Sequence, residues 1–183
     1  MLSLENDRWG ELQATYGDAQ SVARLLSMAA DGAPVDEWYD DLFQELCHQY
    51  TVSEAAYAAL PHLVSLAAHL ETARKELVVL IGSCYASAKL PGAPSIPTDL
   101  EAEWRTAARA AIPLVAQALA KDQLSESDLR YLMFALAALH GYTSLAYVIE
   151  GLDTLIECPN CGQLIDPLAS GLTGILGMGS GSL

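Results

Sequence analysis

Residues 51–70, TVSEAAYAALPHLVSLAAHL, form the stretch that decides the fold. Glu54 is its only charged residue when histidine is counted as neutral. Its apolar residues follow the three- and four-residue spacing that places side chains on one face of a helix. They are Val52, Ala56, Ala59, Leu60, Leu63, Ala67 and Leu70. We therefore expect a helix across residues 51–70 with a wide apolar face.

A second copy of this stretch begins 52 residues later. Residues 107–116, AARAAIPLVA, align with residues 55–64, AAYAALPHLV, with alanine at four shared positions. A fainter copy lies 38 residues upstream of the first. There Val22, Leu25, Leu26, Met28, Ala29 and Ala30 fall in the register of Leu60, Leu63, Val64, Leu66, Ala67 and Ala68. The sequence therefore predicts a protein built from repeated helical units.

Proline occupies the same place in the two clear copies, at Pro61 and Pro113. A proline inside a helix costs about 3 kcal/mol, because it lacks an amide donor and clashes with the carbonyl four residues back. Two prolines in one register therefore indicate a deliberate kink or helix junction, which lets an outer helix curve around its neighbours.

Capping patterns predict where several helices begin. Thr51 with Glu54, and Thr98 with Glu101, match the capping box, in which each side chain satisfies a backbone amide of the first turn. Ser125 with Asp128 predicts a similar cap for a helix that starts near residue 126.

The whole chain is predicted to be all-α. Helices are expected at residues 4–15, 19–30, 35–48, 51–70, 73–89, 99–120, 126–140 and 144–152. Residues 91–98, PGAPSIPT, contain three prolines and are expected to form a loop between two helical hairpins. We divide the chain into a helical domain at 1–152, a cysteine-containing knuckle at 153–168 and a flexible tail rich in Gly and Ser at 169–183.

Successive antiparallel hairpins with proline in the first helix resemble HEAT-like repeats, and the resemblance covers residues 18–140. The segment His48-Gln49-Tyr50-Thr51-Val52, followed by AAYAALPHLV, is also similar to a group of uncharacterised bacterial HEAT-like proteins. The regularly placed Asp and Arg of many HEAT units are missing from this sequence. The resemblance implies a HEAT-like α-solenoid of about three helical hairpins. It is carried by Ala55, Ala56, Ala59, Leu60, Pro61, Leu63 and Val64, repeated as Ala107, Ala108, Ala111, Ile112, Pro113, Val115 and Ala116.

The charge balance is strongly acidic. The chain has nine Lys and Arg against 23 Asp and Glu, a net charge of −14. Because a phosphate backbone would be repelled, we expect no direct nucleic-acid binding. A basic protein is the better-matched partner, although acidic residues on solvated helix faces also serve solubility alone. The expected protein-binding residues are Asp36, Glu37, Asp40, Asp41 and Glu45, on one side of the helix predicted at 35–48.

Neither a membrane span nor secretion is expected. The one long uncharged run, Tyr131–Ile149, carries His140, Gly141, Thr143 and Ser144 near its middle. Charged residues at the start, among them Glu5 and Arg8, interrupt the region where a signal peptide would have its apolar core. We therefore expect a cytoplasmic protein.

The sequence Cys158-Pro-Asn-Cys161-Gly resembles half of a zinc-ribbon knuckle. Two thiolates at this spacing can chelate one metal, but a structural zinc needs four ligands and no second such pair exists. Three outcomes stay open for Cys158 and Cys161: free or oxidisable thiols, a disulfide, or zinc completed by distant residues or by a second copy in a homodimer.

Other chemistry-bearing residues favour structural roles. Cys47 and His48 are adjacent, and neighbouring residues on a helix do not face each other, so we expect no nucleophile and base pair there. His62 and His69 lie two turns apart and could line a groove, although a partly buried structural histidine is favoured. The sequence therefore predicts a non-enzymatic protein-binding module, with a zinc-dependent or thiol-based protein using Cys158 and Cys161 as the alternative.

Overall fold

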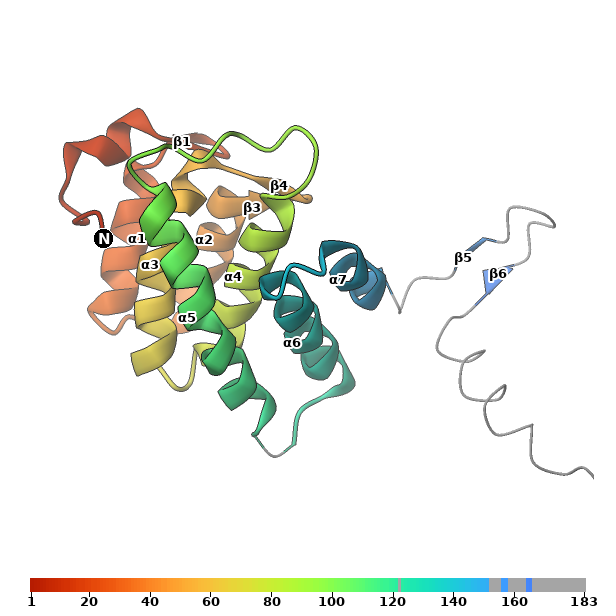
Figure 1. The fold of residues 1–183 in the computed structure, drawn as a ribbon. Helices are drawn as coiled ribbons and strands as arrows, with labels where there is room; N and C mark the ends of the chain where they lie inside the picture. The colour runs from red at the N-terminus through yellow and green to blue at the C-terminus, as the bar shows by residue number, and fades with distance from the viewer. Residues whose placement is uncertain (122, 152–155, 158–163, 166–183) are drawn as a thin grey trace, which may run out of the picture.

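The computed structural model describes residues 1–121, 123–151, 156–157 and 164–165. Within these residues the chain is all-α, as predicted, with seven α-helices joined by short turns (Figure 1). The helices are α1 (Gln20–Ala30), α2 (Tyr39–Leu46), α3 (Glu54–His69), α4 (Arg74–Ser87), α5 (Glu101–Leu119), α6 (Glu126–Leu139) and α7 (Thr143–Glu150).

Short elements complete the described part of the chain. Two 3-10 helices, η1 (Asp7–Glu11) and η2 (Val35–Glu37), precede α1 and α2. Three antiparallel pairs of two-residue strands are also present. They are β1 (Gln13–Ala14) with β2 (Gly17–Asp18), β3 (Cys47–His48) with β4 (Thr51–Val52), and β5 (Ile156–Glu157) with β6 (Leu164–Ile165).

The helices pack as successive pairs in two layers (Figure 1). In one layer α3 lies between α1 and α5, and in the other α4 lies between α2 and α6. Each helix of the first layer also contacts the helix that follows it, and α7 packs on α6. The expected hairpins α1–α2, α3–α4 and α5–α6 are therefore all present, in the stacked order of a helical repeat.

The central helix α3 is buried on most of its surface. Its alanines allow close approach on several sides, and Ala55, Ala56, Ala59, Leu60 and Leu63 are fully buried. Pro61 and Pro113 both lie inside continuous helices, so no helix junction forms at either. Pro61 borders a shallow groove against α5, whereas Pro113 is exposed. The difference arises because α5 is the last helix of its layer among the described residues.

One glycine allows the two helices of the second layer to touch. A Cβ built on Gly82 of α4 would lie 2.5 Å from Cβ and 2.6 Å from Cα of Ala135 in α6. Both residues are buried. Only glycine therefore fits at this crossing without moving one helix away from the other.

Aromatic packing fixes the proline-rich loop. Trp104 of α5 is buried, with its ring centroid 4.9 Å from that of Tyr57 and 5.9 Å from that of Tyr85. The Tyr57 hydroxyl donates a hydrogen bond to the carbonyl of Pro94, with 2.6 Å between the oxygens. Residues 91–98 are thus a loop, as predicted, and one that is fastened to the core.

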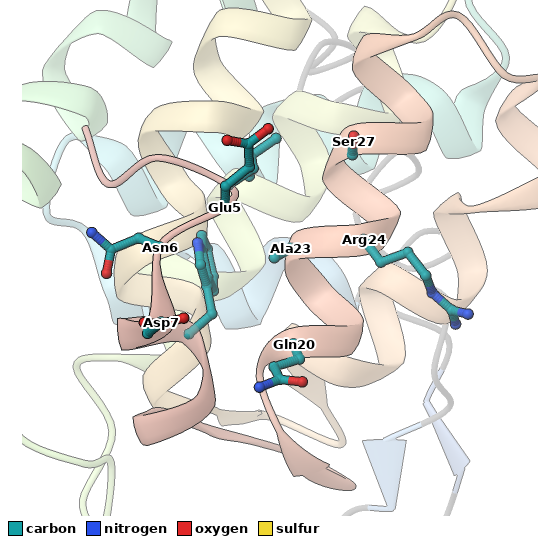
Figure 2. A pocket seen from close by; sticks show the side chains of 9 residues that line it. Glu5, Asn6, Asp7, Gln20, Ala23, Arg24 and Ser27 are labelled. Atoms are coloured by element: carbon teal, nitrogen blue, oxygen red, sulfur yellow. The ribbon is translucent and has the colours of Figure 1, made fainter.

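The helix predicted at residues 4–15 does not form. The chain instead makes η1 and then turns back through β1 and β2, where Ala19 N donates to Leu12 O. Trp9 is buried and its indole donates to Ser3 O, a hydrogen bond within the same segment. Figure 2 shows this segment beside α1, with Glu5, Asn6 and Asp7 on the segment and Gln20, Ala23 and Ser27 on the helix. The segment covers the apolar end of the stack without being a regular helix.

Two of the three predicted capping boxes are wrong. Thr51 belongs to β4, where its hydroxyl donates to the carbonyl of His48, and α3 begins after Ser53. The Glu54 carboxylate instead accepts from Gln13 N at 3.2 Å. The helix α5 begins at Glu101 without a side-chain cap. Tertiary hydrogen bonds have replaced the local ones at the start of α3.

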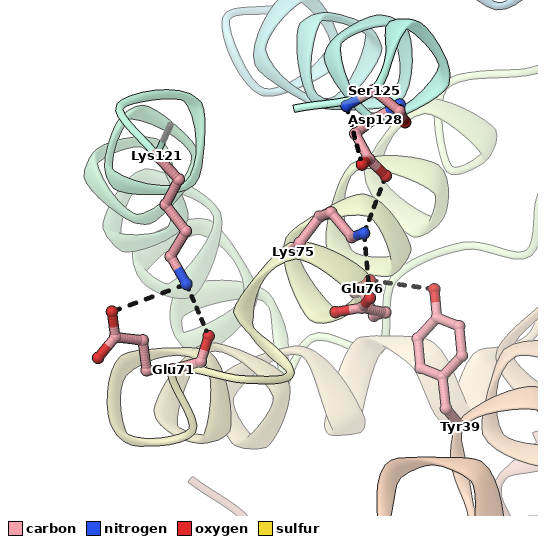
Figure 3. A network of polar contacts seen from close by, with 7 residues as sticks. All are labelled: Tyr39, Glu71, Lys75, Glu76, Lys121, Ser125 and Asp128. Carbon is pink, nitrogen blue, oxygen red and sulfur yellow. Dashed lines mark hydrogen bonds and ion pairs between the residues drawn. The ribbon is translucent and has the colours of Figure 1, made fainter. Parts of the chain in front are cut away.

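The third predicted capping box is confirmed. Asp128 N donates to Ser125 Oγ at 3.0 Å, and Ser125 N donates to Asp128 Oδ2 at 3.3 Å. Lys75 Nζ of α4 lies 2.9 Å from Asp128 Oδ1 (Figure 3). The hydrogen bonds from Lys75 and Ser125 lower the pKa of the Asp128 carboxyl. This carboxylate therefore caps α6 and also joins it to α4.

Two further polar contacts join neighbouring helical hairpins (Figure 3). Lys121 Nζ, after α5, lies 3.1 Å from the carbonyl of Glu71 in the α3–α4 turn. The Tyr39 hydroxyl of α2 donates to the carbonyl of Glu76 in α4 at 3.0 Å. Such contacts between exposed or half-buried groups fix geometry more than they add stability.

We predict that Gly82→Ala lowers the free energy of unfolding by about 2–3 kcal/mol, because the added methyl group overlaps Ala135 and must separate α4 from α6. Chemical denaturation measures this change. Gly151→Ala is the matched control, because a Cβ at Gly151 meets nothing within 4 Å. Equal effects of the two substitutions would show that the α4–α6 crossing is not tight.

Candidate functional site

Four of the predicted binding residues lie together on the surface. Asp36 and Glu37 belong to η2, Asp40 and Asp41 lie in the first turn of α2, and all four side chains are exposed. Within the described part of the chain, none of them forms an ion pair. We call these four residues the acidic face. Its carboxylates are available to a cation in solution.

The acidic face has a fixed position. Trp38 lies in its middle, is buried, and donates its indole hydrogen to Ala33 O at 3.1 Å. Tyr39 anchors the next residue to α4 through its hydroxyl. Burial raises the pKa of the Tyr39 phenol, so this hydroxyl stays a donor at physiological pH. The four carboxylates are therefore presented on a short rigid element.

Glu45, the fifth predicted residue, has a different environment. It is half-buried, and its carboxylate accepts from Tyr16 N at 3.2 Å and from Ser21 Oγ at 3.5 Å. Its backbone carbonyl accepts from Thr15 at 3.0 Å. Glu45 fastens the β1–β2 turn to α2, and the structure does not place it with the other four.

The predicted metal ligands Cys158 and Cys161 lie outside the described residues, as do the knuckle around them and the tail at 169–183. Across residues 1–121 and 123–151, no three His, Cys, Asp or Glu side chains come together as a metal site would require. The zinc hypothesis therefore stays a prediction from the sequence.

A pocket that the sequence analysis missed lies beneath the β3–β4 hairpin, between α2, α4, α6 and α7. We call it the hairpin pocket; its volume is about 260 Å³. Four aromatic residues line it: Phe43, Tyr50, Phe134 and Tyr147. The other lining residues are Cys47, Gln49, Ser83, Ser87 and Glu150. These residues come from segments as distant in sequence as Phe43 and Glu150, which is why no local motif reveals the pocket.

Polar side chains continue from the pocket wall into the core. Cys47 Sγ lies 3.4 Å from Ser87 Oγ, which lies 3.4 Å from the Tyr147 hydroxyl. A hydrogen bond with Cys84 lowers the pKa of the Cys47 thiol, against the effects of burial and of the Glu150 charge. The same bond, together with complete burial, raises the pKa of Cys84.

Cys47 and His48 are not paired. The Cys47 thiol points to Ser87 in the core, whereas the His48 ring contacts the side chains of Gln44 and Tyr16 near the surface. Their places in β3 rather than in a helix explain this, because successive strand residues point to opposite faces. The expectation that these two residues do not face each other is confirmed, although residues 47–48 are not helical.

The turn of the hairpin is strained. Gln49 and Tyr50 have φ angles of 47° and 64°, the pattern of a two-residue type I′ turn. Such turns favour Asn-Gly, because the left-handed backbone is energetically unfavourable for most other residues. The strained turn places the Tyr50 ring at the pocket, with its centroid 5.5 Å from that of Tyr147.

His62 is structural, as the sequence analysis favoured. It is buried beneath the N-terminal segment, and its Nε2 donates to Leu2 O at 2.7 Å. Burial lowers the pKa of its imidazole. His69 is exposed and bonds to Ser65 O of its own helix, so the two rings do not form one site.

The pocket between the N-terminal segment and α1 has a volume of about 400 Å³. Figure 2 shows that Arg24 on α1 directs its guanidinium away from Glu5, Asn6 and Asp7. The pocket therefore brings no opposed charges together, and nothing in its geometry resembles a catalytic arrangement.

No family model, curated protein or solved structure matches the chain. Among the described residues, no helix has the length and apolar character needed to cross a membrane.

We predict that Gln49→Asn raises the free energy of unfolding by about 0.5–1 kcal/mol, because asparagine tolerates a left-handed backbone better than glutamine. Thermal and urea denaturation measure the change. Gln117→Asn in α5 is the control: the same chemical change in an exposed helical position should cost a few tenths of a kcal/mol. A loss of stability at both positions would contradict the strained turn.

We also predict that the protein loses stability as the pH falls below about 6.5, the pKa of an unfolded histidine. The folded pKa of His62 is lower, so the unfolded chain binds the extra proton first. Between about pH 7 and pH 5, the free energy of unfolding measured by denaturation should change less with pH for His62→Gln than for the wild type. His140→Gln, at an exposed position, should keep the wild-type slope.

Proposed function

We propose that this chain is a non-enzymatic protein-binding module whose acidic face contacts a basic protein. The observation that carries the proposal is the acidic face itself: four exposed carboxylates within six residues, with no ion pair among the described residues. A net charge of −14 adds a long-range field that attracts a cationic partner and speeds encounter.

The architecture supports this use. Stacked helical hairpins of the HEAT-like kind present extended surfaces, because each unit contacts only its neighbours and leaves one face free. The acidic face lies on α2, in the first pair of the stack, where Trp38 and Tyr39 hold it rigid. A preorganised charged surface loses little conformational freedom when a partner binds.

One concrete form of the proposal is an inhibitor or immunity-type protein that masks a basic effector such as a nuclease. The effector would present lysines and arginines for nucleic acid, and the acidic face would occupy them. This form rests on charge alone. It assigns no catalytic residue to the chain and no direct contact with nucleic acid or membrane.

The competing interpretation is that the acidic face is merely solvated. Exposed acids keep an alanine-rich surface soluble, and two of the four also suit the first turn of α2 through the helix dipole. Under that interpretation the four residues could be replaced without loss of any binding. The two interpretations therefore differ in what a substitution at this face does.

We predict that neutralising the acidic face with Asp36→Asn, Glu37→Gln, Asp40→Asn and Asp41→Asn abolishes capture of basic proteins from lysate and weakens the isolated complex at least about tenfold. Affinity capture followed by calorimetry of the identified pair measures this. Wild-type binding should also weaken as salt is raised.

The matched control removes four charges elsewhere, through Glu5→Gln, Asp7→Asn, Glu71→Gln and Glu126→Gln, all at exposed positions. This control changes the net charge by the same amount as the acidic-face variant, and it should keep most of the wild-type affinity. If both variants bind like the wild type, or if only acidic partners are captured, the proposal fails.

A further inference from the structure

The hairpin pocket has the features of a binding site, and it is separate from the acidic face. Three of its rings meet in a row: the Tyr50 and Tyr147 centroids are 5.5 Å apart at 76°, and those of Tyr147 and Phe134 are 6.0 Å apart at 63°. Phe43 of α2 completes the aromatic lining. Rings set at steep angles to one another form walls rather than a stack. An enclosed group would therefore meet aromatic surface from several directions.

The described lining of the hairpin pocket contains an acid and no base. Among the lining residues that the structure describes, Glu150 is the one acid, and none is a Lys or Arg. Burial is the main cause of the raised pKa of the Tyr147 phenol, and the nearby Glu150 carboxylate contributes to it. Asp40 of the acidic face lies on α2, one helical turn before Phe43.

These features select one ligand chemistry. Aromatic faces carry negative charge and attract an alkylammonium group, more strongly when the group is desolvated. The carboxylate of Glu150 would repel an anion, and it would give a neutral apolar group no electrostatic attraction. The volume of about 260 Å³ lies just below the usual range of about 300–1,000 Å³ for drug-sized ligands, so the pocket suits a group the size of an amino-acid side chain.

We propose that the hairpin pocket binds an alkylammonium group, held by the rings of Phe43, Tyr50, Phe134 and Tyr147 and by the charge of Glu150. The same chemistry is carried by a free small amine and by a lysine side chain of a bound protein. The proposal concerns a site different from the acidic face and does not rest on its binding a basic partner.

The strained turn gives a second reason to assign a role to this pocket. Tyr50 is 57% exposed and stands on a left-handed backbone, which glycine would adopt without strain. Its ring contacts Tyr147 at the pocket rather than filling the core. Strained residues that present a side chain to a cavity concentrate at ligand sites.

The first test compares two probes of equal shape. Choline and 3,3-dimethylbutan-1-ol differ in carrying a charged trimethylammonium or a neutral tert-butyl group. We expect choline to shift the NMR signals of Tyr50, Tyr147 and Glu150 in a saturable way, and the neutral alcohol to bind at least about tenfold more weakly. Absence of saturable shifts with choline, or equal affinity for both probes, overturns the proposal.

Variants then test the named residues. Tyr50→Gly removes a ring and also relieves the strained backbone, so we expect a folded protein with at least about fivefold weaker choline binding. Gln123→Gly relieves a left-handed backbone at a position that does not line the pocket, and should bind choline like the wild type. Glu150→Gln should weaken binding, whereas Glu126→Gln, at an exposed position on α6, should not. If each variant matches its control, the assignment is overturned.

Two further experiments are needed. One identifies the source of the ligand, and the other distinguishes the pocket proposal from the proposed function of the acidic face. Nα-acetyl-lysine methylamide that binds at least as tightly as choline identifies a lysine side chain, and choline alone identifies a small quaternary amine; both support the pocket. The variant with a neutralised acidic face should still bind choline. Suppose that the wild type binds no choline and that Tyr50→Gly still captures a basic protein. This result would leave the proposed function standing and overturn the inference about the pocket.

Discussion

The tight contact between Gly82 of α4 and Ala135 of α6 is the constraint on which the second layer depends. Because α4 packs between α2 and α6 and also contacts α3, its distance from α6 sets the position of the C-terminal pair relative to the rest. The same rule operates in the first layer, where alanines of α3 leave room for α1 and α5. Small residues thus determine the spacing of the stack, and the large side chains of Trp9, Trp38 and Trp104 are buried within the fold.

This spacing also creates the hairpin pocket. The helix α6 brings Phe134 and carries α7, which in turn brings Tyr147 and Glu150 beside the end of α2 and the β3–β4 turn. Asp40 of the acidic face lies on α2 one helical turn before Phe43, which lines the pocket. In the two proposals, exposed carboxylates would mainly raise the rate at which a cationic partner arrives, whereas an aromatic pocket would mainly slow the departure of a bound amine.

The sequence predicted the parts of this structure that depend on local periodicity. The alanine-proline copies at 55–64 and 107–116 do lie in neighbouring helices of one layer, and Ser125 with Asp128 does cap α6. The same capping pattern failed at Thr51, because Glu54 finds the backbone of Gln13, which is distant in sequence. The acidic face was predictable because its charges are adjacent in the chain. The pocket was not, because Phe43 and Glu150 are brought together only by the stacking of α2, α4, α6 and α7. The one local signal was the pair Gln49-Tyr50, which occupies a turn that usually requires Asn-Gly.

Two energetic costs in this structure lie close together, at α2 and at the hairpin that follows it. Gln49 and Tyr50 are held in a left-handed backbone that costs about 1–2 kcal/mol per residue, and the pairing of Cys47 with Val52 keeps them there. A few residues away, like charges crowd together at Asp40 and Asp41 on a chain that is already acidic. Substitutions that would relieve both costs are single-residue changes and leave the core untouched. A surface needed only for solubility gains nothing from a strained aromatic residue, and a turn needed only for stability would carry glycine. Binding of a cationic group, as proposed for both surfaces, would account for these costs at α2 and its hairpin.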